Sequence, residues 1–420
     1  MNEIVVDRII KRKNVLKVNF SYTNELDRFF CRNSFVAEYS ENIENVPDGV
    51  AVIPFVCNVL PIVWLTDSRL ILQSIDKDFA NCINEIKKGY ESMYEEVAFK
   101  GEVIFEEQCI HQIDNYGEKA MFFSGGLDSL HTLICHMDEK VHLVSIWGSD
   151  IAYQNTEGWN RVYKKVKKTA EQLKLNSVVI RSNFRDFDDE KELDKEFKAR
   201  VQDSWWHGVK HGIGLLGQVA PYVYLHNIST IYIASSFSQD DGKVRCASHP
   251  TIDNRVRFCG CTVIHDGFAS KRQQKINELV QYCETHELKV DMHVCWRSES
   301  GSNCGRCEKC YRTMAGLIIE GADPTDYGFD NIENNIANMQ RCVLYESEKN
   351  PYLASKRWIP IQTRLKENKV VLKNSVWWKH IKWIEKTDFN NIVREKKRLD
   401  RKIEIRKIKR KIKQKLLSFK

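Results

Sequence analysis

The segment "AMFFSGGLDSLHTL", residues 120–133, places its small polar residues directly after an apolar run. The apolar run predicts a buried strand, and the residues after "SGG" predict the start of a helix. Such a turn offers backbone N–H groups and the hydroxyls of Ser124 and Ser129 to an anion. The carboxylate of Asp128 would repel a bare phosphate, so its presence predicts a Mg²⁺ ion shared with a polyphosphate.

The "SGGLDS" segment, residues 124–129, differs from the two common phosphate-binding motifs. It lacks the Lys of G-x-x-x-x-G-K-[ST], and it does not match G-x-G-x-x-G. The alternative is an ordinary strand-to-helix turn in which Ser and Asp cap the helix. Its position after the first apolar strand of an α/β alternation favours a phosphate loop of another kind.

A second chemical pattern lies in "CWRSESGSNCGRCEKCYR", which begins at residue 295. Cys295, Cys304, Cys307 and Cys310 follow the spacing C-x8-C-x2-C-x2-C, and Gly305 eases the sharp turn between two of them. Four thiolates at this spacing predict a tetrahedral Zn²⁺ site with no open position, and hence a structural role. An iron–sulfur cluster and unliganded buried cysteines are the alternatives.

These motifs require an alternation of strands and helices to position them. We expect strands at 119–123, 140–146, 176–181 and 229–235. We expect helices from 127, at 156–174 and at 207–226. Strands that alternate with helices predict a parallel sheet with right-handed crossovers, which is a Rossmann-like α/β domain. Residues 236–267 are predicted to be rich in loops.

The rest of the chain predicts further domains. Short apolar runs, "KVNFSY", "VAVIPFV", "PIVWL" and "RLIL", predict strands before residue 75, and Asp76 is the expected N-cap of a following helix. The predicted organisation is an N-terminal α+β domain (1–112), a sheet domain with the cysteine cluster (118–320), a helical and aromatic region (321–393) and a basic tail (394–420).

The loop resembles the SGG-x-D-S pyrophosphate loop of the PP-loop ATP pyrophosphatases, whose sheet is of the HUP type. The resemblance implies cleavage of ATP between its α- and β-phosphates and transfer of AMP to a substrate oxygen. It assigns catalysis to Ser124, Asp128 and Ser129. The implied nucleotide-binding residues are Ser124, Gly125, Gly126, Leu127, Asp128, Ser129 and, for adenine by position along the second strand, Val144, Ser145 and Ile146.

The loop and the cysteine spacing together resemble the 7-cyano-7-deazaguanine synthase family over residues 118–320. The resemblance implies an ATP-dependent ligase with ATP, Mg²⁺ and Zn²⁺, which adenylates a carboxylate or amide oxygen for attack by ammonia or an amine. The family's acceptor-site pattern is not matched at Trp147–Asp150 or at "SWWHGVKHG". This departure and the extra N-terminal domain favour a different acceptor, such as a sugar acid of a glycan pathway or a modified base of a defence system. Deazaguanine synthesis, tRNA modification and a catalytically inactive nucleotide-binding adaptor remain alternatives.

The acceptor-site candidates lie after the fourth strand of the alternation, near the carboxyl edge where substrates bind. They occur in "SHPTID" and "VIHDG" and comprise His249, Asp253, Arg255, His265 and Asp266. Loop turns that use Asp and Pro for backbone reasons are the alternative. His207 and His211 share one face of a predicted helix, where a chemical role and a packing role are both open.

Composition and charge set the expected environment. The N-terminus lacks the unbroken apolar stretch of a secretory signal, and fourteen cysteines without such a signal predict a cytoplasmic protein with reduced thiols. Residues 394–420 hold 14 Lys and Arg against 3 Asp and Glu, so the rest of the chain is mildly acidic. This acidic body disfavours a broad nucleic-acid groove.

The basic tail has an apolar stripe of its own. Ile405, Ile408, Ile412, Leu416 and Phe419 fall on one side of a predicted helix, with Lys and Arg elsewhere. This pattern is typical of a segment that binds an anionic membrane surface, here the inner face of the membrane. Packing of the stripe on the tail's own domain is the alternative, and a homodimer is a further arrangement that the sequence allows.

Overall fold

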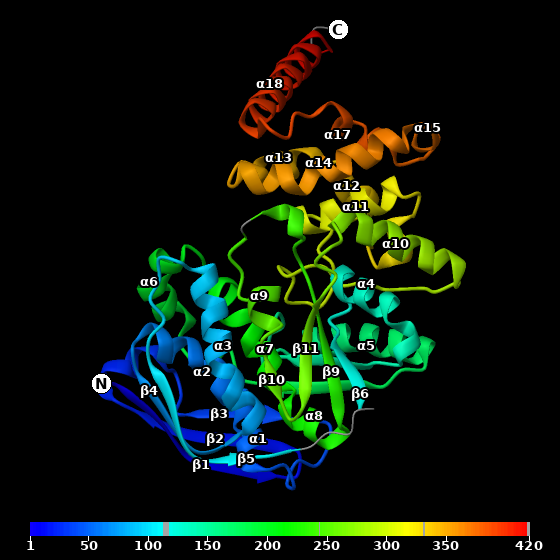
Figure 1. Cartoon of the computed structure of the whole chain (residues 1–420). Coiled ribbons are helices and arrows are strands. Elements are labelled where there is room, and N and C mark those ends of the chain that lie inside the picture. Colours follow the sequence, from blue (N-terminus) through cyan, green and yellow to red (C-terminus); the bar gives the residue numbers. More distant parts are fainter. Residues whose placement is uncertain (112–116, 243, 331, 418–420) are drawn as a thin grey trace. The chain divides into compact units, whose positions relative to one another are not determined.

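Figure 1 shows the computed structural model of the chain, which describes residues 1–111, 117–242, 244–330 and 332–417, with side chains except at 334, 413 and 415–417. The chain forms two compact units. The sheet unit comprises Met1–Ser270 and Glu299–Gly301, and the helical unit comprises Lys271–Ser298 and Ser302–Lys420.

The sheet unit is built on an 11-stranded sheet in the order β10-β11-β9-β6-β7-β8-β3-β2-β1-β4-β5. The strands are β1 (Glu3–Arg12), β2 (Val15–Tyr22), β3 (Ser34–Glu38), β4 (Arg69–Asp76), β5 (Glu102–Cys109), β6 (Glu118–Phe122), β7 (His142–Trp147), β8 (Ser177–Ser182), β9 (Ile228–Ala234), β10 (Arg257–Phe258) and β11 (Cys261–Asp266).

The centre of the sheet is parallel. β6 pairs in parallel with β7 on one side and with β9 on the other, β7 pairs with β8, and β9 pairs with β11. The strands predicted from the alternation correspond to β6, β7, β8 and β9, with boundaries that agree within two residues. An α/β fold with a large, mostly parallel sheet is therefore confirmed.

The N-terminal strands extend this sheet and do not form a sheet of their own. β3 pairs antiparallel with β8 through Ala37 and Ser182, and β2, β1, β4 and β5 follow outward. Backbone pairing thus joins residues 1–111 to the central strands. Residues 112–116, where the first boundary was expected, lie outside the described residues.

The helices of the sheet unit cover the sheet and connect its strands (Figure 1). They are α1 (Asp48–Ala51), α2 (Ile53–Leu65), α3 (Lys77–Met93), α4 (Leu127–Cys135), α5 (Thr156–Leu173), α6 (Glu190–Val201), the π-helix Trp205–Lys210, α7 (His211–Gln218), α8 (Ala220–His226) and α9 (Pro250–Asp253). Short 3-10 helices lie at Asn24–Phe29, Met137–Glu139 and Gln239–Asp241.

The strands predicted at "VAVIPFV" and "PIVWL" are wrong, because this stretch forms α1 and α2. Every residue of α2 is buried, so the segment carries no polar face that would reveal a helical period. Pro54 lies in the first turn, where the missing N–H costs nothing. The other two predicted strands are β2 and β4, and Asp76 caps α3 as expected by accepting a hydrogen bond from Phe79 N at 3.0 Å.

Residues 236–267 are also more regular than expected. β10 and β11 form a hairpin in which Arg257 pairs with Thr262 and Phe258 with Cys261. Cys259 and Gly260 make the two-residue turn, with φ values of 51° and 73°. Since β11 also pairs in parallel with β9, the sequence "VIHDG" begins in a strand of the sheet and not in a loop.

The helical unit contains the cysteine segment and the remaining helices. These are α10 (Arg272–Thr285), α11 (Glu308–Ile319), the 3-10 helix Pro324–Tyr327, α12 (Ile332–Ile336), α13 (Met339–Ser347), α14 (Pro351–Glu367), α15 (Lys369–Leu372), α16 (Trp378–Ile381), α17 (Trp383–Lys386) and α18 (Ile392–Leu417). Trp358 and Phe389 are buried and stack with a centroid distance of 5.7 Å, so these two aromatic residues form part of its core.

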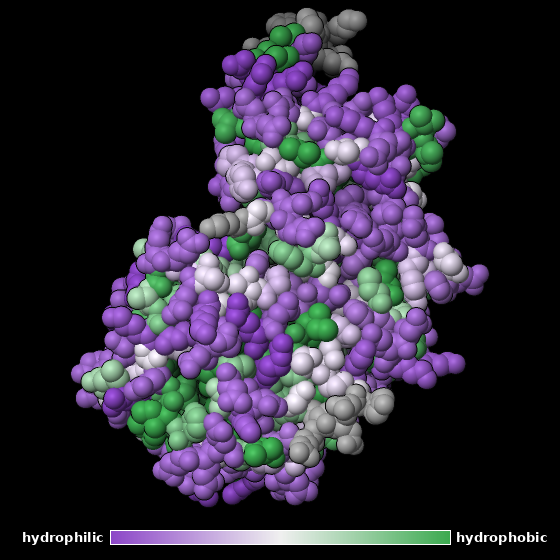
Figure 2. All heavy atoms as spheres, viewed as in Figure 1, coloured by the Kyte–Doolittle hydropathy of each residue, from purple (hydrophilic) through white to green (hydrophobic). Residues whose placement is uncertain are grey.

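The predicted basic tail forms most of α18. Lys396 pairs with Glu348, and Tyr345 OH donates to Asp400, so the start of the helix packs on α13. Further along α18, Ile405, Ile408 and Ile412 are 52–53% exposed. Leu416's side chain and Phe419 lie outside the described part of the chain. Figure 2 shows a hydrophilic surface over the helices that end the chain, interrupted by small apolar spots.

Candidate functional site

The glycine loop, residues 124–129, joins the end of β6 to the start of α4. Gly125 has a φ of 70°, a conformation that favours glycine, and Gly126 is the N-cap of α4. Ser124 Oγ accepts a hydrogen bond from Gly126 N at 3.3 Å, and Ser129 Oγ donates to Gly126 O at 3.0 Å. The two hydroxyl oxygens lie 3.4 Å apart, so the loop brings both predicted hydroxyls together.

The two ends of the loop differ in exposure. Ser124 is exposed and Asp128 is half-buried, whereas Leu127 and Ser129 are buried. The burial of Leu127 anchors the first turn of α4 in the core. A helix leaves its first backbone N–H groups without intrahelical partners, and α4 directs them to the loop. Anion binding at this turn stays a prediction.

The predicted adenine residues lie in β7 beside the loop. Val144 O accepts a hydrogen bond from Phe123 N at 2.8 Å, and Ser145 Oγ donates to Phe123 O at 2.6 Å. Val144 and Ser145 are buried, and Ile146 is half-buried. These contacts fix the end of β6, and through it the position of the glycine loop. Adenine binding by these three residues stays a prediction.

Three of the predicted acceptor residues lie together at the carboxyl end of β11. Asp253 is fully buried, and its Oδ2 lies 2.8 Å from His265 Nδ1 and accepts from Ser248 Oγ at 2.9 Å. The imidazole of His249 lies 6.5 Å from that of His265, between ring centroids. Burial lowers the pKa of His249. Because β11 runs parallel to β6 through β9, this group shares the sheet edge of the glycine loop.

The other two predicted acceptor residues have partners of their own. The guanidinium of Arg255 donates to Thr251 O and pairs with Glu85 of α3 at 3.2 Å. Asp266 accepts from Thr132 Oγ1 at 2.7 Å, which fastens β11 to α4. Both side chains therefore have structural partners among the described residues.

Near this edge, the sequence indicated His207 without its partner and did not indicate a second charged pair. His207 lies in the π-helix, and its Nδ1 is 2.5 Å from Asp203 Oδ2. A hydrogen bond with Asp203, and to a lesser extent one with Cys246, raises the pKa of His207 to about 10. Lys210 and Asp188 form a fully buried ion pair at 2.6 Å, and burial raises the pKa of Asp188 to about 6. A spacing of four marks the first pair in the sequence, whereas nothing local connects Asp188 with Lys210.

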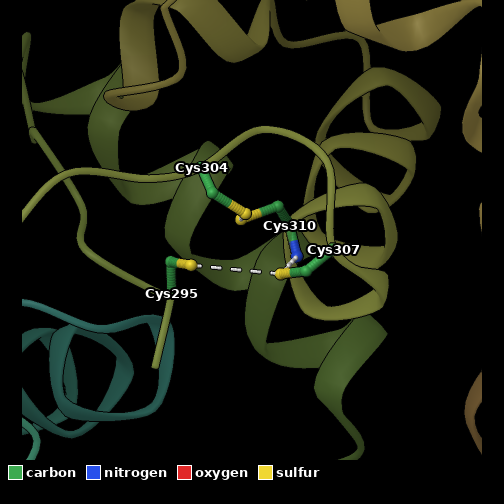
Figure 3. Close-up of side chains that lie close together, drawn as sticks. All are labelled: Cys295, Cys304, Cys307 and Cys310. Carbon is green, nitrogen blue, oxygen red and sulfur yellow. Dashed lines mark hydrogen bonds between the residues drawn. The ribbon is translucent and has the colours of Figure 1, made fainter. Parts of the chain in front are cut away.

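The four predicted metal ligands come together in the helical unit (Figure 3). Their sulfur atoms all lie within 4.8 Å of one another, with 4.0 Å between Cys295 and Cys307 and 3.8 Å between Cys304 and Cys310. Sulfurs bound to one tetrahedral Zn²⁺ at about 2.3 Å are about 3.8 Å apart. The cluster could therefore hold a metal ion such as zinc.

Local geometry forms this cluster. Gly305 has a φ of 61° at the turn after Cys304, and Cys307 is the N-cap of α11, where its Sγ accepts from Cys310 N at 3.5 Å. The mutual hydrogen bonds lower the pKa of Cys295 and raise the pKa of Cys310. A bound cation would stabilise all four thiolates.

No helix in the described part of the chain is long and apolar enough to cross a membrane. Comparison of the chain with protein-family models, with curated proteins and with solved structures found no match.

Proposed function

We propose that the chain is an ATP-dependent enzyme that adenylates a carboxylate or amide oxygen of its substrate. The glycine loop at the carboxyl end of β6 is the observation that carries this proposal. The order of the parallel strands reverses at β6, with β7 and β8 on one side and β9 and β11 on the other. Open α/β sheets bind their ligands at the carboxyl ends of strands, at such a reversal.

The strand order supports the finer fold proposal as well. Numbered from β6 along the chain, the strands β8-β7-β6-β9-β11 have the order 3-2-1-4-5. This order is that of Rossmann-like nucleotide-binding sheets. Together with the "SGGLDS" loop, it supports a PP-loop domain of the HUP type that resembles 7-cyano-7-deazaguanine synthases.

In the proposed reaction, a substrate oxygen attacks the α-phosphorus of ATP, the bond to the β-phosphate oxygen breaks, and pyrophosphate leaves. Backbone N–H groups of the loop with Ser124 and Ser129 would bind the pyrophosphate, and Asp128 would hold Mg²⁺. Ammonia or an amine then attacks the activated carbon and displaces AMP. Positioning and charge stabilisation supply the rate, and no enzyme nucleophile takes part.

The acceptor would lie beside His249, Asp253 and His265, at the same edge of the sheet as the glycine loop. Asp253 holds His265 through its Oδ2, while its Oδ1 has no hydrogen-bond partner within the described residues. A buried carboxylate oxygen of this kind favours a polar ligand group next to it. The proposed acceptor is a small molecule or a glycan-linked acid. In the helical unit, the cysteine cluster with bound zinc would have a stabilising role.

A second proposal concerns α18. Its basic residues and the exposed stripe of Ile405, Ile408 and Ile412 support attachment to an anionic membrane surface. Salt-sensitive sedimentation with anionic vesicles, lost on deletion of residues 394–420, tests it. Salt-sensitive binding of tRNA by the same segment, without vesicle binding, would favour the tRNA-modification alternative instead.

The central test is the product of ATP cleavage. The full chain is incubated with Mg·ATP and a panel of carboxylic acids with ammonia, and nucleotides are separated by chromatography. We expect AMP and pyrophosphate, and a loss of at least about 100-fold in Asp128→Asn. Asp138→Asn, an exposed carboxylate just beyond α4, is the matched control. ADP and phosphate as products would contradict the proposal, and nucleotide binding without turnover would favour the adaptor alternative.

A further inference from the structure

Two histidines and two glutamates meet at the amino ends of the central strands. Glu118 and His142 are the first residues of β6 and β7, His226 ends α8, and Glu41 follows β3. Glu118 Oε2 lies 2.9 Å from His142 Nε2, and Glu41 Oε2 lies 2.6 Å from His226 Nε2. The two imidazole centroids are 5.8 Å apart. Four segments that are distant in the sequence thus converge on one place.

We propose that Glu118, His142 and His226 bind a divalent transition-metal ion of the zinc class. One ligand atom from each of the first three residues lies within 4.8 Å of the other two. Atoms that share a zinc ion at about 2.0–2.2 Å have separations in this range. Imidazole and carboxylate groups suit zinc and neighbouring metals, whereas Mg²⁺ and Ca²⁺ prefer oxygen ligands alone.

The surroundings of His142 match those of a metal ligand. Its Nδ1 lies 2.7 Å from the hydroxyl of buried Tyr222, which orients the ring so that Nε2 faces Glu118. Metal-bound histidines characteristically have their second nitrogen held by such a hydrogen bond. Asn176 Nδ2, 3.4 Å from the same Nε2, is the further polar neighbour.

The site also has an entry path. The side chain of His142 is 6% exposed, whereas that of Glu118 is 61% exposed and that of Glu41 is 40% exposed. A rigid buried ligand therefore lies beneath carboxylates that solvent reaches, so an ion can enter without unfolding of the sheet.

This site is separate from the proposed adenylation site. Glu118 begins β6, and the glycine loop follows the end of the same strand, so the two lie at opposite edges of the parallel sheet. A metal ion here would connect the end of α8 to the starts of β6 and β7. Its expected role is structural, and the proposal does not rest on the proposed enzyme activity.

Zinc itself is the probe in the test. The full chain and a His142→Gln/His226→Gln variant are saturated with Zn²⁺ and passed over a desalting column, and their zinc is measured by atomic emission. We expect about one zinc ion fewer per chain in the variant. Zinc in the cysteine cluster contributes equally to both proteins and does not affect the difference. Added zinc should raise the melting temperature of chelator-treated wild type more than that of the variant.

Three further variants keep the test decisive. Tyr222→Phe should weaken zinc binding at this site by about 10–100-fold, as expected for the loss of a supporting hydrogen bond. Glu118→Gln removes an exposed ligand without disturbing the core, and it decides the outcome if the histidine variant fails to fold. Glu44→Gln, an exposed residue near Glu41, is the control. Equal zinc content in wild type and the histidine variant, or unchanged affinity in Glu118→Gln, would overturn the proposal and leave two ordinary His–Glu pairs.

Discussion

The cysteine cluster and the sheet edge around the glycine loop are assembled in different ways. All four cysteines lie within residues 295–310. The turn at Gly305 and the first turn of α11 bring their sulfur atoms together. The sheet edge instead combines the loop at 124–129 with His249 and His265, which are more than a hundred residues away. Ligands that are close in the sequence can be predicted from spacing, whereas the second kind of site requires the sheet to form.

The largest expected effect would come from breaking the local cluster. Cys307→Ser should give insoluble protein, because structural zinc sites bind with about 10–16 kcal/mol in zinc-finger peptides and that binding drives folding. Soluble yield and zinc content provide the measurement, and Cys31→Ser, an exposed thiol of the sheet unit, is the control. Soluble protein with wild-type stability and no zinc would show that the helical unit folds without the ion.

The sheet unit should be most sensitive at the buried pair of Lys210 and Asp188. Lys210→Met leaves a fully buried carboxylate unpaired and should lower the free energy of unfolding by about 3–5 kcal/mol, measured by urea denaturation. The double variant Lys210→Met/Asp188→Leu is the matched control and should recover much of this loss. Equal stability of the single variant and wild type would mean that the pair contributes nothing to the long-range assembly.

A smaller effect is expected within the glycine loop. Gly125 has a φ of 70°, yet among the described residues an added Cβ would meet only Val166 Cγ2, at 3.9 Å. Gly125→Ala should therefore lower stability by about 1–2 kcal/mol through backbone strain alone. Gly126, with a φ of −80°, tests this reasoning, since Gly126→Ala should cost far less. Equal melting temperatures for the two variants would contradict it.

The smallest expected effect is a pH dependence. Because hydrogen bonds with Asp203 and Cys246 raise the pKa of His207 to about 10, the folded state holds a proton that the unfolded state loses above its ordinary pKa of 6.5. This stabilisation is complete below pH 6.5 and disappears as the pH rises toward 10. The melting temperature of wild type should fall more steeply than that of His207→Gln over this range, and parallel curves would exclude the pair as a source of stability.

The sequence by itself determined the features that depend on neighbouring residues. The strands β6 to β9, the glycine loop at the end of β6, the N-cap Asp76 and the four cysteines are all encoded within short segments. Period, turn residues and ligand spacing are local signals, so each could be predicted before the structure was known.

Only the tertiary structure decided which distant segments meet. The sequence did not reveal that α2 is a helix, because a segment buried on every side carries no periodic polar face. The tertiary structure joined residues 1–111 to the central sheet through β3 and β8, and it gave Arg255 and Asp266 partners on α3 and α4. Backbone pairing and burial determine these outcomes. Both depend on the whole packed sheet, so no single stretch of the sequence predicts them.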